Sequence, residues 1–423
     1  ASWKDAAPDG VETAADRVHA DTAWLADRAR QGRGIGTAGL TAAGDFISRR
    51  LGVLGVTPGM AAAGSAAGQM PSSASYRQSF DVVTHIEVAP SSALSLGTDA
   101  IASSAFQPLA ASANGDAEGE VVLAGYGIVD KAAGLDDYAK LDVTGKIVLV
   151  RRFVPRGKIA DPKAAQRHSD IRYKAWLARQ RGASAMLVVD LPAEAEATLL
   201  QEADFPALTP EGYGDAGIPV MVIKRAAAAK LMAKLQARGK SVRGKAVRAK
   251  LHVALTKKKT AAFNVVGKLA ANVEPRQPGS IVIGAHYDHL GRGPFGSLAP
   301  DSRDLHLGAD DNASGVAALL ETARALGPMK RRRDVWFVAF SGEERGLLGS
   351  THFVRNLPPQ IGTMRAMLNM DMVGRLRNNT LKVLGGRSAL EWADVLVGAC
   401  ASARVKCVVG GDGYGPSDHT PFY

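Results

Sequence analysis

Residues 281–288 have the sequence Ile281-Val-Ile-Gly-Ala-His-Tyr-Asp288, in which a short apolar run ends directly before a histidine. Two further apolar runs have the same form, Val335-Trp-Phe-Val-Ala-Phe340 and Ala366-Met-Leu-Asn-Met370. Their length and the polar residues that close them are typical of buried strands. Because ligands of an open α/β sheet bind outside the carboxyl ends of its strands, we expect the residues after these runs to meet at one edge of a sheet.

The residues that follow the three runs are of the kinds that bind metals. His286 follows the first run, Glu343 and Glu344 follow the second, and Asp371 follows the third. A fourth acidic cluster, Gly308-Ala-Asp-Asp-Asn-Ala-Ser-Gly315, comes before a stretch of helical composition. Nitrogen and oxygen ligands without thiolate suit zinc, with cobalt or manganese as substitutes. The sequence therefore predicts a metal site.

The types and spacing of these residues suggest individual roles. Two zinc ions about 3.5–4 Å apart need a short, rigid bridging carboxylate, for which Asp311 is our candidate, while spacing alone leaves Asp310 open. Of the adjacent glutamates, one can bind metal and the other can stay free as a base. Asp288 lies on the same side of an extended segment as His286 and could orient its imidazole.

Two other histidines of this region, His289 and His306, are expected to be solvent or loop residues.

Composition sets broad limits. A chain of 423 residues exceeds what one core usually organises, so we expect two domains. The net charge of +11 comes partly from basic runs at 230–259 and 330–333, which lack interleaved aromatic residues. We interpret them as solvated faces and expect no nucleic-acid partner. No apolar run reaches the roughly 18 residues of a membrane helix, so no membrane span is expected. Cys400 and Cys407 allow one local disulfide, which the sequence leaves open.

The chain before the metal-ligand region has two patterns. Residues 21–59 predict two helices around the glycine-rich turn 31–39, where Arg33 and Thr37 could stabilise the turn or contact a substrate. Between 114 and 255 the pattern changes to short strands with one helix near 169–181. We therefore expect residues 1–113 and 256–423 to form one domain, into which a smaller domain of residues 114–255 is inserted.

At this point the motifs resemble the di-zinc aminopeptidases, zinc exopeptidases related to glutamate carboxypeptidase and the transferrin receptor, with an inserted protease-associated (PA) domain. The similar segments are Gly32-Arg-Gly-Ile-Gly-Thr37, Asp137-Tyr-Ala-Lys-Leu-Asp-Val-Thr-Gly-Lys-Ile-Val-Leu-Val150, Gly284-Ala-His-Tyr-Asp288, Asp311-Asn-Ala-Ser-Gly315, Ser341-Gly-Glu-Glu344, Asn369-Met-Asp371 and Ser417-Asp-His-Thr-Pro-Phe422.

The resemblance implies an α/β fold, a zinc-exopeptidase (phosphorylase/hydrolase-like) sheet with helices on both faces, interrupted by a smaller β-rich α+β PA domain. It implies an aminopeptidase that uses two zinc ions, a water between them and a general base to hydrolyse peptides with a free N-terminus. The implied metal ligands are His286, Asp311, Glu344 and Asp371, with Asp311 as the bridge. Glu343 would be the general base, and Asp288 would be the partner that orients the ligand His286.

One feature departs from the family. Its last zinc ligand is a histidine in a Tyr-His segment downstream of Ser-Asp-His, and this sequence stops at Tyr423 before such a segment. We expect a truncated C-terminus, with replacement by His419 or a degenerate site as alternatives. Asp418 and His419 match an active-site loop of the family.

Rival functions also follow from the resemblance. They are a receptor-like member without catalysis, a one-zinc glutaminyl cyclase and a carboxypeptidase for acidic substrates. The first residue, Ala1, fits removal of a signal peptide and fits a fragment equally well. We expect a secreted or periplasmic protein, and the sequence does not reveal an oligomeric state.

Overall fold

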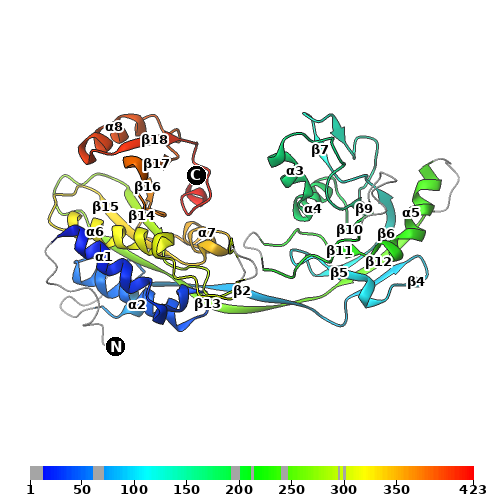
Figure 1. Cartoon of the computed structure of the whole chain (residues 1–423), viewed down its shortest axis with the longest axis horizontal. Coiled ribbons are helices and arrows are strands. Elements are labelled where there is room, and N and C mark those ends of the chain that lie inside the picture. The colour runs from blue at the N-terminus through cyan, green and yellow to red at the C-terminus, as the bar shows by residue number, and fades with distance from the viewer. Residues whose placement is uncertain are drawn as a thin grey trace. The chain divides into compact units, whose positions relative to one another are not determined.

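The computed structural model describes residues 13–60, 71–191, 201–210, 214–239, 246–293, 296–298 and 302–423. The chain divides into two compact units, Ala1–Val82 with Lys259–Tyr423, and Val83–Lys258 (Figure 1). The inserted unit thus begins about thirty residues before the expected boundary at 114. The reason is that β3 (Ala93–Leu96), β4 (Asp99–Ala100) and β5 (Phe106–Pro108) pair within the sheet of the second unit.

The first unit is built on a six-stranded mixed sheet. Its strand order is β1-β13-β15-β14-β16, and β2 also pairs with β13. The strands β14, β15 and β16 run parallel, whereas β13 is antiparallel to β15. The bounds are β1 (Thr57–Pro58), β2 (Arg77–Val88), β13 (Leu255–Leu269), β14 (Ser280–His286), β15 (Asp334–Phe340) and β16 (Met364–Asn369).

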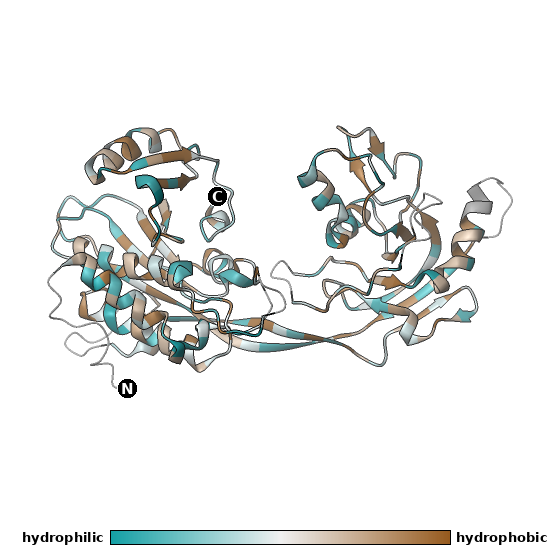
Figure 2. Ribbon diagram, viewed as in Figure 1, coloured by the Kyte–Doolittle hydropathy of each residue, from teal (hydrophilic) through white to brown (hydrophobic). Residues whose placement is uncertain are grey.

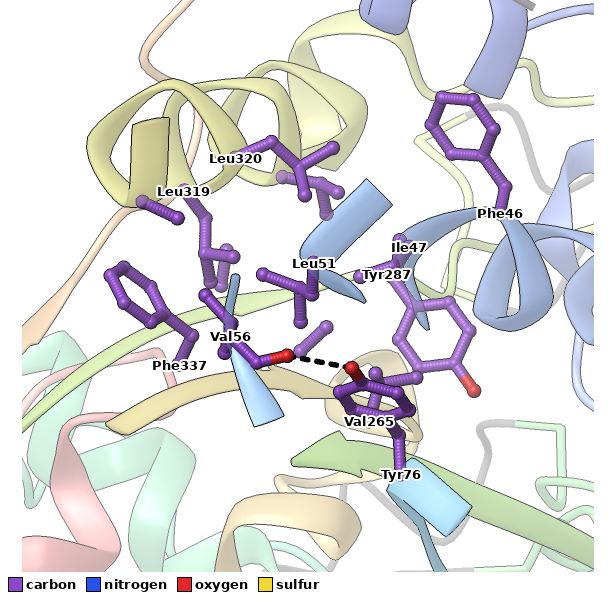
Figure 3. Close-up of a cluster of buried hydrophobic side chains, with 14 of the residues drawn as sticks. Phe46, Ile47, Leu51, Val56, Tyr76, Val265, Tyr287, Leu319, Leu320 and Phe337 are labelled. Carbon is purple, nitrogen blue, oxygen red and sulfur yellow. Dashed lines mark hydrogen bonds between the residues drawn. The ribbon is translucent and has the colours of Figure 1, made fainter. Parts of the chain in front are cut away.

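Three helices cover one face of this sheet, namely α1 (Ala14–Leu25), α2 (Ala38–Val53) and α6 (Gly315–Leu326). The side chain of Thr37 accepts a hydrogen bond from Leu40 N, which fixes where α2 begins. The buried apolar residues of α2, among them Phe46, Ile47 and Leu51, pack with Leu319, Leu320 and Phe337 (Figure 3). The first helix begins earlier than predicted, because Thr13 caps it at Ala14.

The other face is covered by α7 (Leu348–Arg355) and by the 3₁₀ helix η9 (Thr420–Phe422). The rings of Phe340, Phe353 and Phe422 lie 6.0–6.1 Å apart, centroid to centroid. Helices therefore flank both faces of the sheet, as predicted. Phe422 also fixes the segment that carries Asp418 and His419 beside the end of β15.

The last elements of the first unit are β17 (Thr380–Leu384), α8 (Trp392–Ala403) and β18 (Lys406–Gly410). The strands β17 and β18 form a separate parallel pair. Val397 and Val408 are exposed, and Figure 2 shows hydrophobic colour along α8 and β18. Cys400 and Cys407 form the disulfide that the sequence had left open.

The second unit is a curved eight-stranded sheet with the order β4-β3-β12-β6-β9-β10-β11-β5. Helix α4 (Ile171–Gln180) packs on one face of this sheet, with α3 (Pro162–Ser169) against it, and α5 (Arg225–Gly239) packs on the opposite face. The remaining strands are β6 (Gly115–Leu123), β7 (Val129–Asp130), β8 (Leu135–Asp136), β9 (Ile147–Arg151), β10 (Ala185–Val189), β11 (Val220–Ile223) and β12 (Arg248–Val253). None of the helices within the described ranges is long and apolar enough to cross a membrane.

Candidate metal centre

The parallel strands β14, β15 and β16 bring the predicted residues to one edge of the first unit. His286 is the last residue of β14, and Asp371 follows β16 by two residues. Glu343 and Glu344 lie in the 3₁₀ helix η7 (Glu343–Arg345), just after β15. Asp311 lies in the turn that leads into α6. The strand-end argument therefore placed these residues together correctly.

A first group of possible metal ligands consists of His286, Asp311 and Asp371. The Nε2 atom of His286 is 3.3 Å from Asp311 Oδ1 and also 3.3 Å from Asp371 Oδ1. Zinc ligands at about 2.0–2.2 Å from the ion lie about 3.3–3.6 Å from one another in a tetrahedron. The two distances fit that arrangement, and the nitrogen and oxygen donors suit zinc.

Neighbouring polar groups hold Asp371 in this position. The hydroxyl of Ser417 donates to Asp371 Oδ2 at 2.7 Å, and Asn369 Nδ2 donates to Ser417 Oγ at 2.8 Å. One carboxylate oxygen is thereby fixed, and the other faces His286. Such partners commonly orient metal ligands, so Ser417 gives the C-terminal segment a direct link to the site.

A second group consists of His289, Asp311 and Glu344. His289 lies in a loop, as expected, but its ring faces Glu344 rather than solvent, with an Nδ1–Oε1 distance of 2.6 Å. That distance is a hydrogen bond, shorter than the edge of a zinc tetrahedron, so the two atoms would separate around an ion. The signal available in the sequence was a second histidine only three residues after His286.

Glycine at position 308 allows this placement of His289. Gly308 has φ +61°, and a Cβ added there would lie 2.6 Å from His289 Cγ. Any other residue would therefore be strained and would displace the ring. The other loop histidine, His306, packs edge-on against His289 with centroids 6.4 Å apart and belongs to neither group.

The structure separates the two adjacent aspartates. Asp311 belongs to both ligand groups, whereas among the described residues Asp310 belongs to neither. Asp310 instead accepts hydrogen bonds from Gly374 N at 2.9 Å and from the side chain of Arg375. Asp311 thus has the position that a shared ligand would need.

Asp288 has a different contact from the expected one. The Nδ1 atom of His286 lies 3.2 Å from the backbone oxygen of Asp288 and 3.8 Å from its Oδ1. The carboxylate accepts instead from Glu343 N at 3.2 Å. Asp288 therefore orients the imidazole through its backbone and supports the glutamate loop through its side chain. Burial raises the pKa of Asp288 to about 6.

In the part of the chain that the structure describes, Glu343 is the adjacent glutamate that belongs to neither ligand group. Its side chain is 13% exposed, and its Oε2 lies 4.0 Å from His286 Nε2. Burial raises the pKa of Glu343 to about 9, against the opposing effect of His286. A carboxyl group that is near the ligands and free of them can exchange protons with a molecule bound there.

The predicted loop residues Asp418 and His419 lie close to the groups without joining them. Asp418 is fully buried, which raises its pKa to about 7. His419 is partly buried, and burial lowers its pKa. Among the described residues neither is part of a ligand group, so His419 does not take the place of a ligand here.

Known families match both units of the chain. Residues 264–423 match Peptidase family M28, and residues 108–231 match the PA domain. Aminopeptidase YwaD of Bacillus subtilis (strain 168) is 31% identical over 171 residues, which cover 38% of this chain and 33% of that protein. A probable zinc metalloprotease of Pyrenophora teres f. teres (strain 0-1) is 36% identical over 110 residues, covering 26% and 22%. The chain thus aligns with a third or less of the length of these relatives.

A solved structure resembles the whole fold. The aminopeptidase from Aneurinibacillus sp. strain AM-1 superposes with a TM-score of 0.51 at 23% identity, covering 96% of this chain and 82% of that one. At that identity the likeness concerns the fold alone.

The two aspartates allow a matched test of the site. We expect Asp311→Asn to lower the zinc content of the purified protein strongly, because a neutral amide replaces the carboxylate common to both groups. Asp310→Asn should keep wild-type zinc content, because an amide oxygen still accepts from Gly374 N. Metal analysis by mass spectrometry measures both, and equal losses in the two variants would contradict the shared position of Asp311.

Proposed function

We propose that this protein is a zinc-dependent aminopeptidase that removes N-terminal residues from peptides, because residues 264–423 match Peptidase family M28 and residues 108–231 match the PA domain. The observation that carries the proposal is that two ligand groups share Asp311 and that Glu343, which among the described residues belongs to neither group, lies beside them. This arrangement combines ligands and a base within one strand edge. A protein that only binds a partner has no need of such a combination.

The proposal includes two zinc ions, with cobalt or manganese as substitutes. His286, Asp311 and Asp371 would hold one ion, and Asp311, Glu344 and His289 the other. When bound, zinc polarises a peptide carbonyl and makes water easier to deprotonate.

The chain's own residues supply the proton transfers. The positive charge of bound metal favours the ionised form of Glu343, against the effect of its burial. The Glu343 carboxylate then accepts a proton from the attacking water as the new C–O bond forms. The same carboxyl group then gives that proton to the leaving nitrogen as the C–N bond breaks. Asp288 holds the backbone of Glu343 at 3.2 Å and thus keeps the carboxyl group beside the ligands.

The charge of the site favours the amino end of a peptide over its carboxyl end. Asp311, Glu344 and Asp371 converge there, and a free α-amine is cationic at neutral pH. Asp288 and Glu343 add two further carboxyl groups beside these ligands. When all five are ionised they exceed the charge of two zinc ions, so they would attract this amine and repel a C-terminal carboxylate. This supports an aminopeptidase over a carboxypeptidase.

Glu343→Gln is the direct test of the base. The amide cannot take a proton, and general bases contribute about 10²–10⁴-fold, so kcat on aminoacyl amides should fall by at least ~100-fold. The zinc content should stay at the wild-type value, because Glu343 is not a ligand. As a control, Glu344→Gln should lose zinc as well as activity, and near-normal turnover in Glu343→Gln would overturn the assignment.

His289→Ala tests the second ion. We expect zinc per chain to fall from two to one, since the second group keeps only two residues. His306→Ala, which removes the neighbouring ring, should keep both ions. If His289→Ala binds as much zinc as wild type, His289 is only a hydrogen-bond partner of Glu344. A wild-type protein with one zinc ion per chain would favour the one-zinc glutaminyl cyclase over the aminopeptidase.

We also propose a secreted or periplasmic location. The Cys400–Cys407 disulfide supports this, because disulfides persist mainly in oxidising compartments. In its own cells the protein should be found outside the cytoplasm with both cysteines resistant to maleimide. Cytoplasmic protein with two reactive thiols would contradict the proposal.

A further inference from the structure

A turn far from the ligands in sequence lies directly against the loops that carry them. The turn 31–34, defined as residues Gln31–Gly34, has left-handed backbone at Gln31, Gly32 and Arg33. A Cβ at Gly32 would lie 2.2 Å from His306 O and 2.8 Å from Gly291 O. Only glycine permits so close an approach. The turn therefore packs against the segment after His289, at Gly291, and against the segment before Asp311, at His306.

The side chain of Arg33 is fully buried and donates four hydrogen bonds to backbone carbonyls. Its Nε donates to Tyr287 O at 2.8 Å, and its Nη2 donates to Gly308 O at 2.7 Å. Its Nη1 donates to Leu307 O at 2.9 Å and to Leu25 O at 2.7 Å. The backbone of Arg33 contributes as well, because His289 N donates to Arg33 O at 3.1 Å.

These acceptors lie next to the proposed ligands. Tyr287 stands between His286 and Asp288, and Gly308 comes three residues before Asp311. One guanidinium therefore joins the loop after β14 to the loop before α6. A lysine could not replace it, since one ammonium with three donors cannot reach four carbonyls in this fork arrangement.

The charge of Arg33 also matters to the site. Burial lowers its pKa to about 10, and Asp288, Asp311 and Glu344 oppose that shift. The group thus stays cationic at neutral pH beside three acidic residues. The hydrogen bonds of Arg33 go to backbone carbonyls. The guanidinium therefore offsets the negative charge of the acidic residues and leaves the carboxylate oxygens of Asp311 and Glu344 available to a metal.

We infer that Arg33 is a positioning residue of the metal centre, which fixes the spacing between the 286–289 and 307–311 segments so that Asp311 can serve both ligand groups. The inference rests on the proposed function and adds to it a residue outside the ligand region. Full burial of the side chain rules out the alternative of direct substrate contact, which the sequence had left open.

The test compares two arginines that bind carbonyls in the same unit. Arg331 donates to the carbonyls of Gly327 at 3.0 Å, Met329 at 2.8 Å and Ala270 at 3.3 Å. Arg331 precedes the first residue of β15, whereas Glu343 follows its last residue, so the two lie at opposite ends of that strand. Arg33→Lys and Arg331→Lys should both lower the melting temperature of the metal-free protein. Only Arg33→Lys should weaken cobalt and zinc binding, by about 10–100-fold, the usual effect of losing a partner that orients ligands.

Affinity is measured by competition with a chromogenic chelator, and the visible absorption of the cobalt-loaded protein reports the geometry at the ion. Arg33→Lys should alter that spectrum at saturating cobalt and lower kcat more than it raises KM. Binding within twofold of wild type with an unchanged spectrum would overturn the inference. So would an equal loss of affinity in Arg331→Lys.

Two further outcomes are also decisive. If Arg33→Lys does not fold, Arg33→Gln is measured in the same way, and failure of both to fold in the presence of zinc would make Arg33 a folding residue and overturn the inference. Wild-type protein that binds neither metal would overturn the proposed function itself. Tight binding in wild type and Arg33→Lys alike would leave that function standing and remove only the role of Arg33.

Discussion

Repulsion between carboxylates at the end of β14 is the constraint on which the site depends. Asp311 and Asp371 each approach His286 within 3.3 Å, and Asp288 and Glu343 are close enough to change its pKa. Burial favours the protonated acids, which is why the pKa values of Asp288 and Glu343 lie above the usual range. A divalent ion would remove much of this unfavourable charge, so metal binding and stability of the first unit are linked.

Such a cluster needs a frame that resists the repulsion, and two polar side chains provide cross-links between the loops. Arg33 joins the loop after β14 to the loop before α6. Asn312 joins that second loop to the loop after β16, because its Nδ2 donates to Met370 O at 2.9 Å and its Oδ1 accepts from Met372 N at 3.1 Å. Each link uses backbone carbonyls or amides, so the carboxylates remain available as ligands.

The sequence was sufficient for those parts of the site that follow from strand periodicity. His286, Glu344 and Asp371 could be predicted because each comes soon after a run of apolar residues, and parallel strands end at a common edge. His289 could not, since its direction depends on the backbone of a loop and on space beside Gly308. The contacts of Arg33 depend on a turn more than 250 residues away from Tyr287, and no local pattern encodes such a distance.

The same distinction applies to the fold. The core helices and strands have periodic patterns, whereas the start of the inserted unit depends on β3, β4 and β5, which are two to four residues long and carry little periodicity. In the second sheet β3 pairs with β12 and β5 pairs with β11, and both partners lie over a hundred residues later, whereas β4 joins the sheet through β3.

The second unit is inserted outside the part of the sequence that carries the proposed ligands. The chain leaves the first unit along β2 and returns along β13, and β2 pairs with β13. In the sheet order, β13 neighbours β15 on the side away from β14 and β16. The proposed ligands, from His286 to Asp371, therefore follow one another in an uninterrupted part of the sequence. Their spacing depends on the parallel strands and on the links made by Arg33 and Asn312.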